Sequence, residues 1–412
     1  MLNYICNYEF KKKDISIFVV FLLACVYFIS QFLRSALGIT ILSISSDLQL
    51  NYEQIGMLGG IFFLSFALVQ IPLGILLDKF DPLKVIILMV LIIYIGTIIL
   101  SFANSYELTF LARFLQGVGC GACLMGPLVF LAKNSAKSNF SKYSGIIMGF
   151  GGLGALFAFN PFYHLTVLIG WRDSFFIFSF SIVIICFILM LLHKFRKKNK
   201  PITIKNGSFA IFIFIFTNKN FLKLLPMSIF GYASAAFILT LWGSKFLSIK
   251  KIISDYEISL ILTSMALFWT LGSLFFGYVN GKYNIGKKLV IISSLVLITF
   301  LLLFTFVSIN NFFFIIIVFS IYGFFGAFTL VILDHYRRLF GNEIIGKVLT
   351  SANLFNFGGV FFIQWITGYI INHVTENKGF TVEQGFSISF VIVAISLALS
   401  LLFYISADEG YA

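Results

Sequence analysis

The chain alternates long apolar segments with short polar ones along nearly all of its 412 residues. A helix needs about 20 apolar residues to cross a bilayer, whereas a barrel strand needs only about 10. The apolar segments are too long for strands, and backbone groups in lipid require the internal hydrogen bonds of a helix. We therefore predict an all-α membrane protein whose twelve transmembrane helices span Ile15–Ile44, Tyr52–Leu77, Val85–Ala103, Leu108–Leu131, Ser144–Leu165, Ser174–Leu192, Leu224–Leu247, Ile258–Val279, Leu289–Val307, Phe312–Ile332, Val348–Ile371 and Phe386–Ile405.

The longest hydrophilic stretch divides these helices into two sets of six. It runs from His193 to Lys223 and contains a basic cluster that begins at Lys194. We predict an N-terminal six-helix bundle over residues 1–192, a basic linker over 193–223 and a C-terminal six-helix bundle over 224–412. The apolar stretch Phe209–Phe216 within the linker is too short to span, so we expect it to lie along the membrane surface or to pack beneath the bundles.

Composition supports a membrane location and explains the positive charge. The chain is 60% hydrophobic and 11% charged, with a net charge of +13. Of its 29 Lys and Arg residues, 22 fall on one side of the predicted membrane and five on the other. Basic residues collect on the cytoplasmic side of membrane proteins. The charge therefore indicates topology rather than nucleic-acid binding, and it places the linker and both termini in the cytoplasm.

A charged turn between two apolar segments occurs twice, about half a chain apart. The first copy runs from Gly74 to Lys84 and the second from Gly277 to Lys287, and their glycine, aromatic and basic positions correspond. Many secondary transporters consist of two related bundles that rock about a site between them. The repeat therefore points to transport.

These features together resemble the major facilitator superfamily. The matching signatures are Gly74-Ile-Leu-Leu-Asp78-Lys79 with Lys84 in the first turn, Arg113-Phe-Leu-Gln-Gly117-Val-Gly119 in the fourth helix and Gly170-Trp-Arg172 before the sixth. The resemblance implies two bundles with a substrate site between them. It also implies that Gly74, Asp78, Lys79 and Lys84 form an inner-gate motif.

Two departures from the superfamily's patterns lead to further expectations. The second copy of the turn has Gly281 where the first has Asp78, so we expect an ionic inner latch from the N-terminal half alone. The predicted fifth helix is rich in glycine but lacks the Gly-Pro pair typical of drug–proton antiporters. Drug efflux is therefore not the leading hypothesis.

Arg34 is the first candidate for substrate binding. It lies inside the first predicted helix, where an unpaired charge costs about 2.5–3.5 kcal/mol on insertion scales. Its guanidinium either binds a carboxylate through two hydrogen bonds, or extends toward the membrane surface, or caps a neighbouring helix. Gln31 and Tyr27 lie on the same helical face and are candidates for the same site, with core packing as the alternative for Tyr27.

Arg113 is the second candidate, and a structural hydrogen-bonding role is the alternative. Two arginines at membrane depth favour anionic substrates. No Asp or Glu falls deep within a predicted helix, so the usual proton-carrying carboxylate of a symporter is missing. His164 could titrate but lies near a helix end, where a structural role is the alternative. Facilitated diffusion and exchange stay open, and coupling to a proton is unproven.

The predicted eleventh helix carries neutral hydrogen-bonding groups. Asn353, Asn356 and Gln364 fall near one face, and Gly358 and Gly359 allow neighbouring helices to approach. The three amides either orient the polar part of a substrate or bond adjacent helices. Tyr232, Trp242 and Trp269 either wall the site or pack in the core.

We predict a secondary transporter, not an enzyme, that moves a small organic solute by alternating access. The expected substrate carries a carboxylate, as an amino acid, a short peptide or an organic acid does. The alternatives are an exporter of lipophilic or chelating compounds and a non-transporting sensor on a transporter scaffold. Four scattered histidines and the lack of a phosphate-binding loop argue against a metal, a cofactor or ATP. We expect a monomer in a bacterial inner membrane, with its substrate and lipid as partners.

Overall fold

The computed structural model describes residues 15–195, 210–249, 253–306, 311–340 and 344–408. The secondary structure of this part of the chain is helical, in agreement with the predicted fold class. The helices are α1 (Ile17–Asp47), α2 (Tyr52–Lys79), α3 (Pro82–Ser101), α4 (Tyr106–Cys120), α5 (Ala122–Asn134), α6 (Lys137–Phe157), α7 (Asn160–Phe195), α8 (Ala210–Thr217), α9 (Lys219–Phe237), the π-helical turn η2 (Ile238–Trp242), α10 (Gly243–Ile249), α11 (Asp255–Tyr283), α12 (Gly286–Phe306), α13 (Phe312–Gly326), α14 (Thr329–Leu339), α15 (Ile345–Lys378) and α16 (Val382–Ile405).

Eleven helices in the described residues are long and apolar enough to cross a membrane. The predicted fifth span, Ser144–Leu165, is divided between α6 and α7. α7 then turns sharply at Gly170, where φ is +82°, before it continues as the predicted sixth span. Glycine suits this turn because an L side chain is strained at positive φ. The eleven spans do not include α6 (Lys137–Phe157), so the expected count of twelve requires α6 and the part of α7 before this turn to be counted together as a further span.

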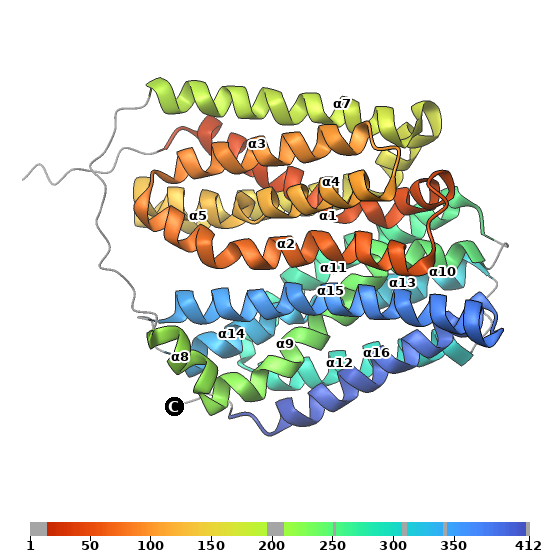
Figure 1. The fold of residues 1–412 in the computed structure, drawn as a ribbon. Helices are drawn as coiled ribbons and strands as arrows, with labels where there is room; N and C mark the ends of the chain where they lie inside the picture. Colours follow the sequence, from red (N-terminus) through yellow and green to blue (C-terminus); the bar gives the residue numbers. More distant parts are fainter. Residues whose placement is uncertain (1–14, 196–209, 250–252, 307–310, 341–343, 409–412) are drawn as a thin grey trace, which may run out of the picture.

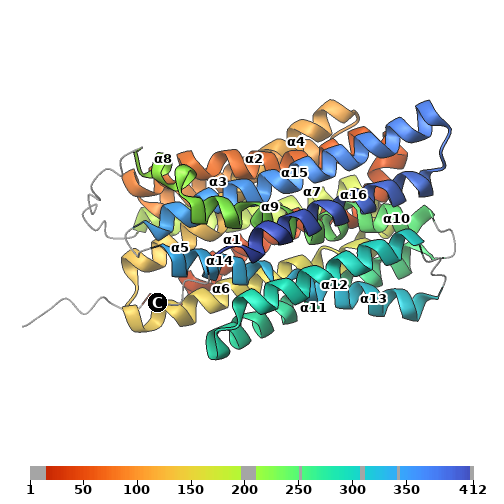
Figure 2. The ribbon, with the colours of Figure 1, turned by 90° about the horizontal axis from the view of Figure 1, so that it is seen from below.

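The long helices lie roughly parallel and form two groups (Figure 1). In the first group, α1 packs on α6 and α3 packs on α4 and α7. In the second group, α11 packs on α13, and α9 packs on α15 and α16, as the view in Figure 2 also shows. α2 packs along α15, and η2 contacts α1, so these pairs join the two groups. We call the surface between the groups the seam. Much of the predicted linker lies outside the described residues, so its bounds stay a prediction.

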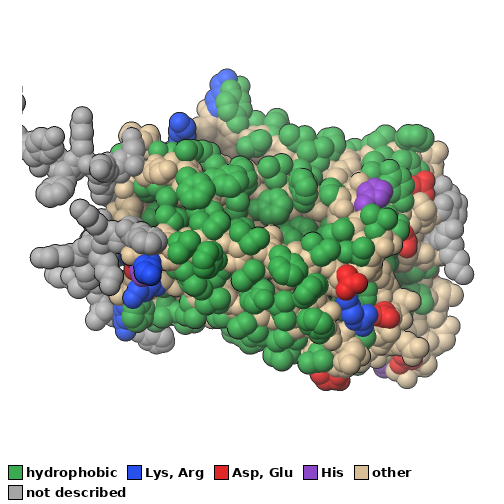
Figure 3. All heavy atoms as spheres, turned by 90° about the horizontal axis from the view of Figure 1, so that it is seen from above, with side chains coloured by type: hydrophobic (Ala, Val, Ile, Leu, Met, Phe, Trp, Pro, Cys, Tyr) green, Lys and Arg blue, Asp and Glu red, His purple; other side chains and the backbone are tan. Residues whose placement is uncertain are grey.

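Charged side chains mark the two ends of the molecule, and apolar side chains cover the surface between them (Figure 3). We call the end that holds Lys79, Lys84, Lys133, Lys287 and Arg338 the basic end, and the other the opposite end. An apolar belt between two charged ends is the surface expected where a protein contacts lipid. The protein is therefore a multi-pass membrane protein.

The two copies of the charged turn are held by corresponding contacts at the basic end. In the first group, Lys133 Nζ donates to the carbonyl oxygen of Leu77 over 2.9 Å. In the second group, Asn280 Nδ2 donates to Asp334 Oδ2 over 2.9 Å. Asn280 occupies the position in the second copy that Leu77 occupies in the first. The repeat seen in the sequence is thus also a repeat of helix-to-helix contacts.

The Gly170-Trp-Arg172 signature joins helices at the opposite end. Arg172 forms an ion pair with Asp47 at the end of α1, and its Nε donates to the carbonyl oxygen of Ala103 over 2.8 Å. Trp171 Nε1 donates to the same Asp47 over 3.3 Å. These bonds fix the turn in α7 against the end of α1.

The short apolar segment of the linker forms α8. Phe216 near its end packs against Phe221 of α9 and Phe355 of α15, with ring centroids 5.9 and 5.8 Å away. The segment therefore packs against the second group of helices, which is one of its two expected placements.

Candidate functional site

Arg34 lies near the middle of α1, beside one phenylalanine ring from each group of helices. Its Cζ is 4.9 Å from the ring centroid of Phe66 in α2 and 5.0 Å from that of Phe357 in α15. The two ring centroids are 4.4 Å apart. Because α1 and α2 belong to the first group and α15 to the second, the guanidinium lies at the seam. Cation–π contacts of this kind contribute about 0.5–2 kcal/mol each.

Two buried polar atoms at this place have no hydrogen-bond partner. They are Arg34 Nε, a donor, and Gln31 Oε1, an acceptor, and the statement holds for the described residues. The Arg34 side chain as a whole is only partly buried. Unmatched buried polar groups cost free energy until a partner arrives. A carboxylate would pair the guanidinium, and an N–H or O–H of the same ligand would pair the Gln31 oxygen.

Aromatic side chains extend this place into both groups. Tyr27 packs its ring on Gly151 of α6, where an added Cβ would lie 2.2 Å from Tyr27 Cε1. Tyr27 lies seven residues before Arg34, on the same face of α1. The Tyr232 ring contacts those of Phe357 and Trp269, with centroid distances of 5.4 and 6.2 Å. We define the seam site as Tyr27, Gln31, Arg34, Phe66, Tyr232, Trp269 and Phe357.

Arg113 lies inside the first group and is only 2% exposed. Its Nη1 donates to the carbonyl oxygen of Leu33 over 2.9 Å and to Gln116 Oε1 over 3.0 Å. The Phe62 ring centroid lies 4.5 Å from its Cζ. Because Leu33 precedes Arg34 in the chain, these contacts hold the backbone that carries Arg34. The geometry supports a positioning role, while direct contact with a substrate stays a prediction.

Replacing Arg113 with Ala is expected to destabilise the protein by about 2–4 kcal/mol, because it removes both hydrogen bonds and leaves a cavity beneath Phe62. The measurement is the unfolding temperature of the detergent-purified protein. Arg337→Ala is the matched control, because Arg337 is exposed at the basic end. An unfolding temperature that rises in Arg113→Ala would contradict the prediction and show that burying the charge costs more than its bonds return.

The predicted amides of α15 make bonds between helices in this conformation. The amide nitrogen of Asn356 faces the carbonyl oxygens of Ala352 and Ser228, at 3.1 and 3.0 Å once the amide is turned to donate. Gln364 Nε2 donates to Thr240 Oγ1 over 2.8 Å. Asn353 is partly exposed, one turn from Phe357. In this conformation Asn356 and Gln364 therefore bond to neighbouring groups in the protein, which is the second of the two expected roles. Contact of Asn353, Asn356 or Gln364 with a substrate stays a prediction.

The two adjacent glycines of α15 differ from each other. A Cβ on Gly359 would lie 2.6 Å from Ile229 Cγ2 of α9, so this glycine does permit close approach. A Cβ on Gly358 would meet nothing within 4 Å. The expectation of close approach is therefore wrong for Gly358, which points away from the α9 contact.

The seam between α2 and α15 is tight toward the opposite end. A Cβ on Gly56 would lie 2.4 Å from the carbonyl oxygen of Gln364, and a Cβ on Gly368 would lie 2.5 Å from that of Tyr52. These two glycines are not among the predicted site residues. The sequence Gly56-Met-Leu-Gly59-Gly60 does indicate close packing, because small residues spaced along an apolar helix are typical of helix contacts in membranes.

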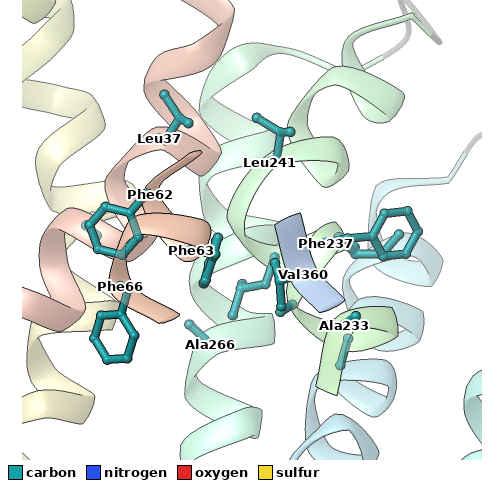
Figure 4. Close-up of a cluster of buried hydrophobic side chains, with 14 of the residues drawn as sticks. Leu37, Phe62, Phe63, Phe66, Ala233, Phe237, Leu241, Ala266 and Val360 are labelled. Atoms are coloured by element: carbon teal, nitrogen blue, oxygen red, sulfur yellow. The ribbon is translucent and has the colours of Figure 1, made fainter. Parts of the chain in front are cut away.

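Apolar side chains from both groups meet near the seam site. Figure 4 shows Phe62, Phe63 and Phe66 of α2 on one side, with Phe237 and Val360 on the other. They are buried members of one continuous apolar core or pack directly into it. Packed apolar side chains from both groups therefore fill this part of the seam.

Two glycines toward the basic end of α2 and α15 make no comparable close contact. Gly74 falls on the face of α2 that carries Gly56, and Gly346 falls near the face of α15 that carries Gly368. A Cβ on Gly74 or on Gly346 would meet nothing within 4 Å. The other motif residues, Asp78, Lys79 and Lys84, are exposed. The close contacts of α2 with α15 at glycines therefore lie toward the opposite end, and Gly74 and Gly346 make no such contacts toward the basic end.

The sequence profile of the Major Facilitator Superfamily matches residues 23–363. The chain belongs to this superfamily. Its members are transporters of small solutes, and the repeat, the seam and the signature positions described above are those of such a transporter.

Curated relatives of this superfamily member are transporters. A probable sulfoacetate transporter of Cupriavidus necator, SauU, is 29% identical over 154 residues, which are 36% of this chain and 35% of the relative. An uncharacterized transporter of Buchnera aphidicola is 25% identical over 319 residues, which are 76% of this chain and 79% of the relative. The chain thus spans about a third of the length of the sulfoacetate transporter that it matches.

Solved structures of superfamily members share the fold over almost the whole chain. A bacterial homologue of the human lysosomal transporter Spinster, in an inward-facing and occupied conformation, has a TM-score of 0.76 at 17% identity and covers 96% of this chain and 97% of its own. A D-xylose–proton symporter has a TM-score of 0.75 at 14% identity, with coverages of 96% and 99%. These likenesses show the major facilitator fold.

Proposed function

We propose that this superfamily member is a secondary transporter of a small organic solute that bears a carboxylate, such as an amino acid, a short peptide or an organic acid. The observation that carries the proposal is the Arg34 guanidinium, which lies partly exposed at the seam with an unpaired donor. A carboxylate supplies the two acceptors that a guanidinium binds best. The unpaired Gln31 oxygen would accept from the ammonium or hydroxyl group of the same solute.

One relative supports an anionic substrate. Sulfoacetate, which the Cupriavidus necator relative is named for, is a small organic anion. A cationic site suits such a compound in the same way that it suits a carboxylate. Arg113 would assist by holding the backbone of α1 next to Arg34.

We infer that transport proceeds by alternating access. Close helix contacts at Gly56 and Gly368 toward the opposite end, without counterparts at Gly74 and Gly346, support a difference between the two ends, as rocking of two bundles about a central site requires. With the basic end in the cytoplasm, the closely packed end would face outward. The exposed motif of Gly74, Asp78, Lys79 and Lys84 would form its gate contacts when the basic end closes. A monomer in a bacterial inner membrane fits this mechanism.

A thermal-shift screen tests the substrate class, because a ligand stabilises the state that it binds. The panel contains alanine, dialanine, succinate and sulfoacetate on one side, and tetraphenylphosphonium and ethidium on the other. We expect stabilisation by one or more of the four carboxylate compounds and none by the cations. Stabilisation by the cations alone would overturn the carboxylate proposal.

A second candidate is export of a lipophilic or chelating compound. The aromatic members of the seam site, Phe66, Tyr232, Trp269 and Phe357, favour it because flat apolar walls suit such ligands. Counterflow of the stabilising compound in liposomes separates either kind of transporter from a sensor, since a sensor binds its ligand without moving it.

A further inference from the structure

The positive charge of the seam site has no fixed negative partner. In the described residues the acidic side chains lie toward the two ends of the molecule, where Asp47 and Asp334 pair with Arg172 and Arg338. No Asp or Glu of the sequence falls deep within a predicted transmembrane helix. Arg34 contacts two phenylalanine rings and makes no ion pair with any described residue.

The histidines do not supply a proton carrier at the seam site either. His193 and His335 lie at the basic end, where His193 pairs with Asp81 and His335 contacts Tyr404. His164 lies beside Tyr256 toward the opposite end, and His373 near the end of α15 stacks on Tyr369. No described acidic or histidine side chain therefore balances the charge on Arg34, and an anion that enters the site would do so.

Rocking of the two groups of helices would leave the contacts of Arg113 unchanged but would alter those of Arg34. The contacts of Arg113 are with Leu33, Phe62 and Gln116, all within the first group, so they move with it unchanged. Arg34 also contacts Phe357 of the second group. Its surroundings change during rocking, and water must leave it in the intermediate in which both ends are closed.

We propose that the protein is an obligate exchanger of organic anions, which crosses the membrane loaded and not empty. Closing both ends over an empty site would bury an unpaired guanidinium, which is strongly unfavourable. Closing over a bound carboxylate buries an ion pair joined by charge-assisted hydrogen bonds. The bound anion thus stabilises the closed intermediate more than either open state, and this lowers the barrier to crossing. The inference rests on the proposed function, because it requires an anionic substrate.

The test measures efflux from liposomes that contain the full-length protein. The liposomes are preloaded with the one labelled compound among alanine, dialanine, succinate and sulfoacetate that gives the largest thermal shift. Potassium and valinomycin hold the membrane potential at zero, so that net movement of charge does not slow efflux. We expect efflux into buffer that contains the same unlabelled compound to be at least ten-fold faster than efflux into buffer without it.

The outcomes separate the inference from the proposed function. Equal efflux rates with and without the external compound would overturn obligate exchange and leave a carboxylate transporter standing. Failure of all four compounds to shift the unfolding temperature or to move would instead remove the proposed function.

A variant that supplies its own counter-ion tests the physical cause. Gln31→Glu places a carboxylate one turn before Arg34 on the same face of α1. We expect the empty variant to cross, so that the ratio of the two efflux rates falls toward one and the affinity for the compound falls. Ser46→Glu, which places the same charge at an exposed position near the end of α1 and outside the seam site, is the matched control and keeps the high ratio. A folded, transporting Gln31→Glu protein with an unchanged ratio would overturn the charge argument; if that variant does not fold, the ratio for the unchanged protein decides.

Discussion

Replacing Arg34 with Ala is expected to abolish the stabilisation of the protein by carboxylate compounds and to lower their affinity at least 100-fold. Removing one partner of a desolvated, hydrogen-bonded ion pair costs about 3–5 kcal/mol, and each 1.4 kcal/mol is about a tenfold change in affinity. The seam site holds no second free cation among the described residues to replace Arg34, since Arg113 is buried and bonded to Leu33 and Gln116. The measurement is a titration of the thermal shift with the best carboxylate of the panel.

Two further variants show whether the guanidinium itself matters. Arg34→Lys keeps the charge but loses the planar fork, so we expect an affinity between those of the Arg and Ala proteins. Arg337→Ala removes an exposed arginine at the basic end and should leave the affinity unchanged. If the Arg34→Ala protein binds the carboxylate within tenfold of the unchanged protein, the anchor lies elsewhere. If it binds only the lipophilic cations, and binds them undiminished, export becomes the first hypothesis.

The sequence predicted the helices well because bilayer thickness sets the length of an apolar segment. It predicted their boundaries less well where local backbone geometry decides. The break between Phe157 and Asn160 lies in apolar sequence within the predicted fifth span, and hydropathy does not distinguish such a break from a continuous helix. The π-helical turn Ile238–Trp242 was missed for the same reason. The turn at Gly170, in contrast, falls in the gap predicted between the fifth and sixth spans.

The candidate site was only partly predictable. Arg34 stood out because a charge inside an apolar helix is expensive and therefore rare. Its neighbours Phe66 and Phe357 did not, because they are two of 54 phenylalanines and their position depends on contacts between helices far apart in the sequence. The amides Asn356 and Gln364 illustrate the same limit. Their types predicted hydrogen bonding, but only packing against α9 and η2 showed their partners.

Adding a methyl group at Gly56 is expected to move the protein out of the conformation in which α2 and α15 pack closely at the opposite end. The Cβ of Gly56→Ala would lie 2.4 Å from the carbonyl oxygen of Gln364 and 3.2 Å from the Cα of Gly368, and neither backbone atom can rotate aside. Overpacking of this kind costs about 1–3 kcal/mol. This cost destabilises the state in which the opposite end is closed. In the state in which the opposite end is open, α2 and α15 separate at Gly56 and the clash is relieved. A cost of that size changes the ratio of the two states about 5- to 150-fold.

Double electron–electron resonance measures the distance between spin labels at Ser46 and Lys378 and so detects this change. Both residues are exposed at the opposite end, in α1 and α15, and the native cysteines are replaced by Ala in the labelled protein. We expect longer distances in Gly56→Ala. Gly346→Ala is the matched control on the same pair of helices, because its methyl group would meet nothing within 4 Å, and it should leave the distances unchanged. Identical distances in both variants would show that the tight seam does not set the conformation.

Because exchange needs both states in turn, Gly56→Ala should also slow counterflow while still binding the carboxylate at Arg34. Arg34→Ala should instead lose binding and counterflow together.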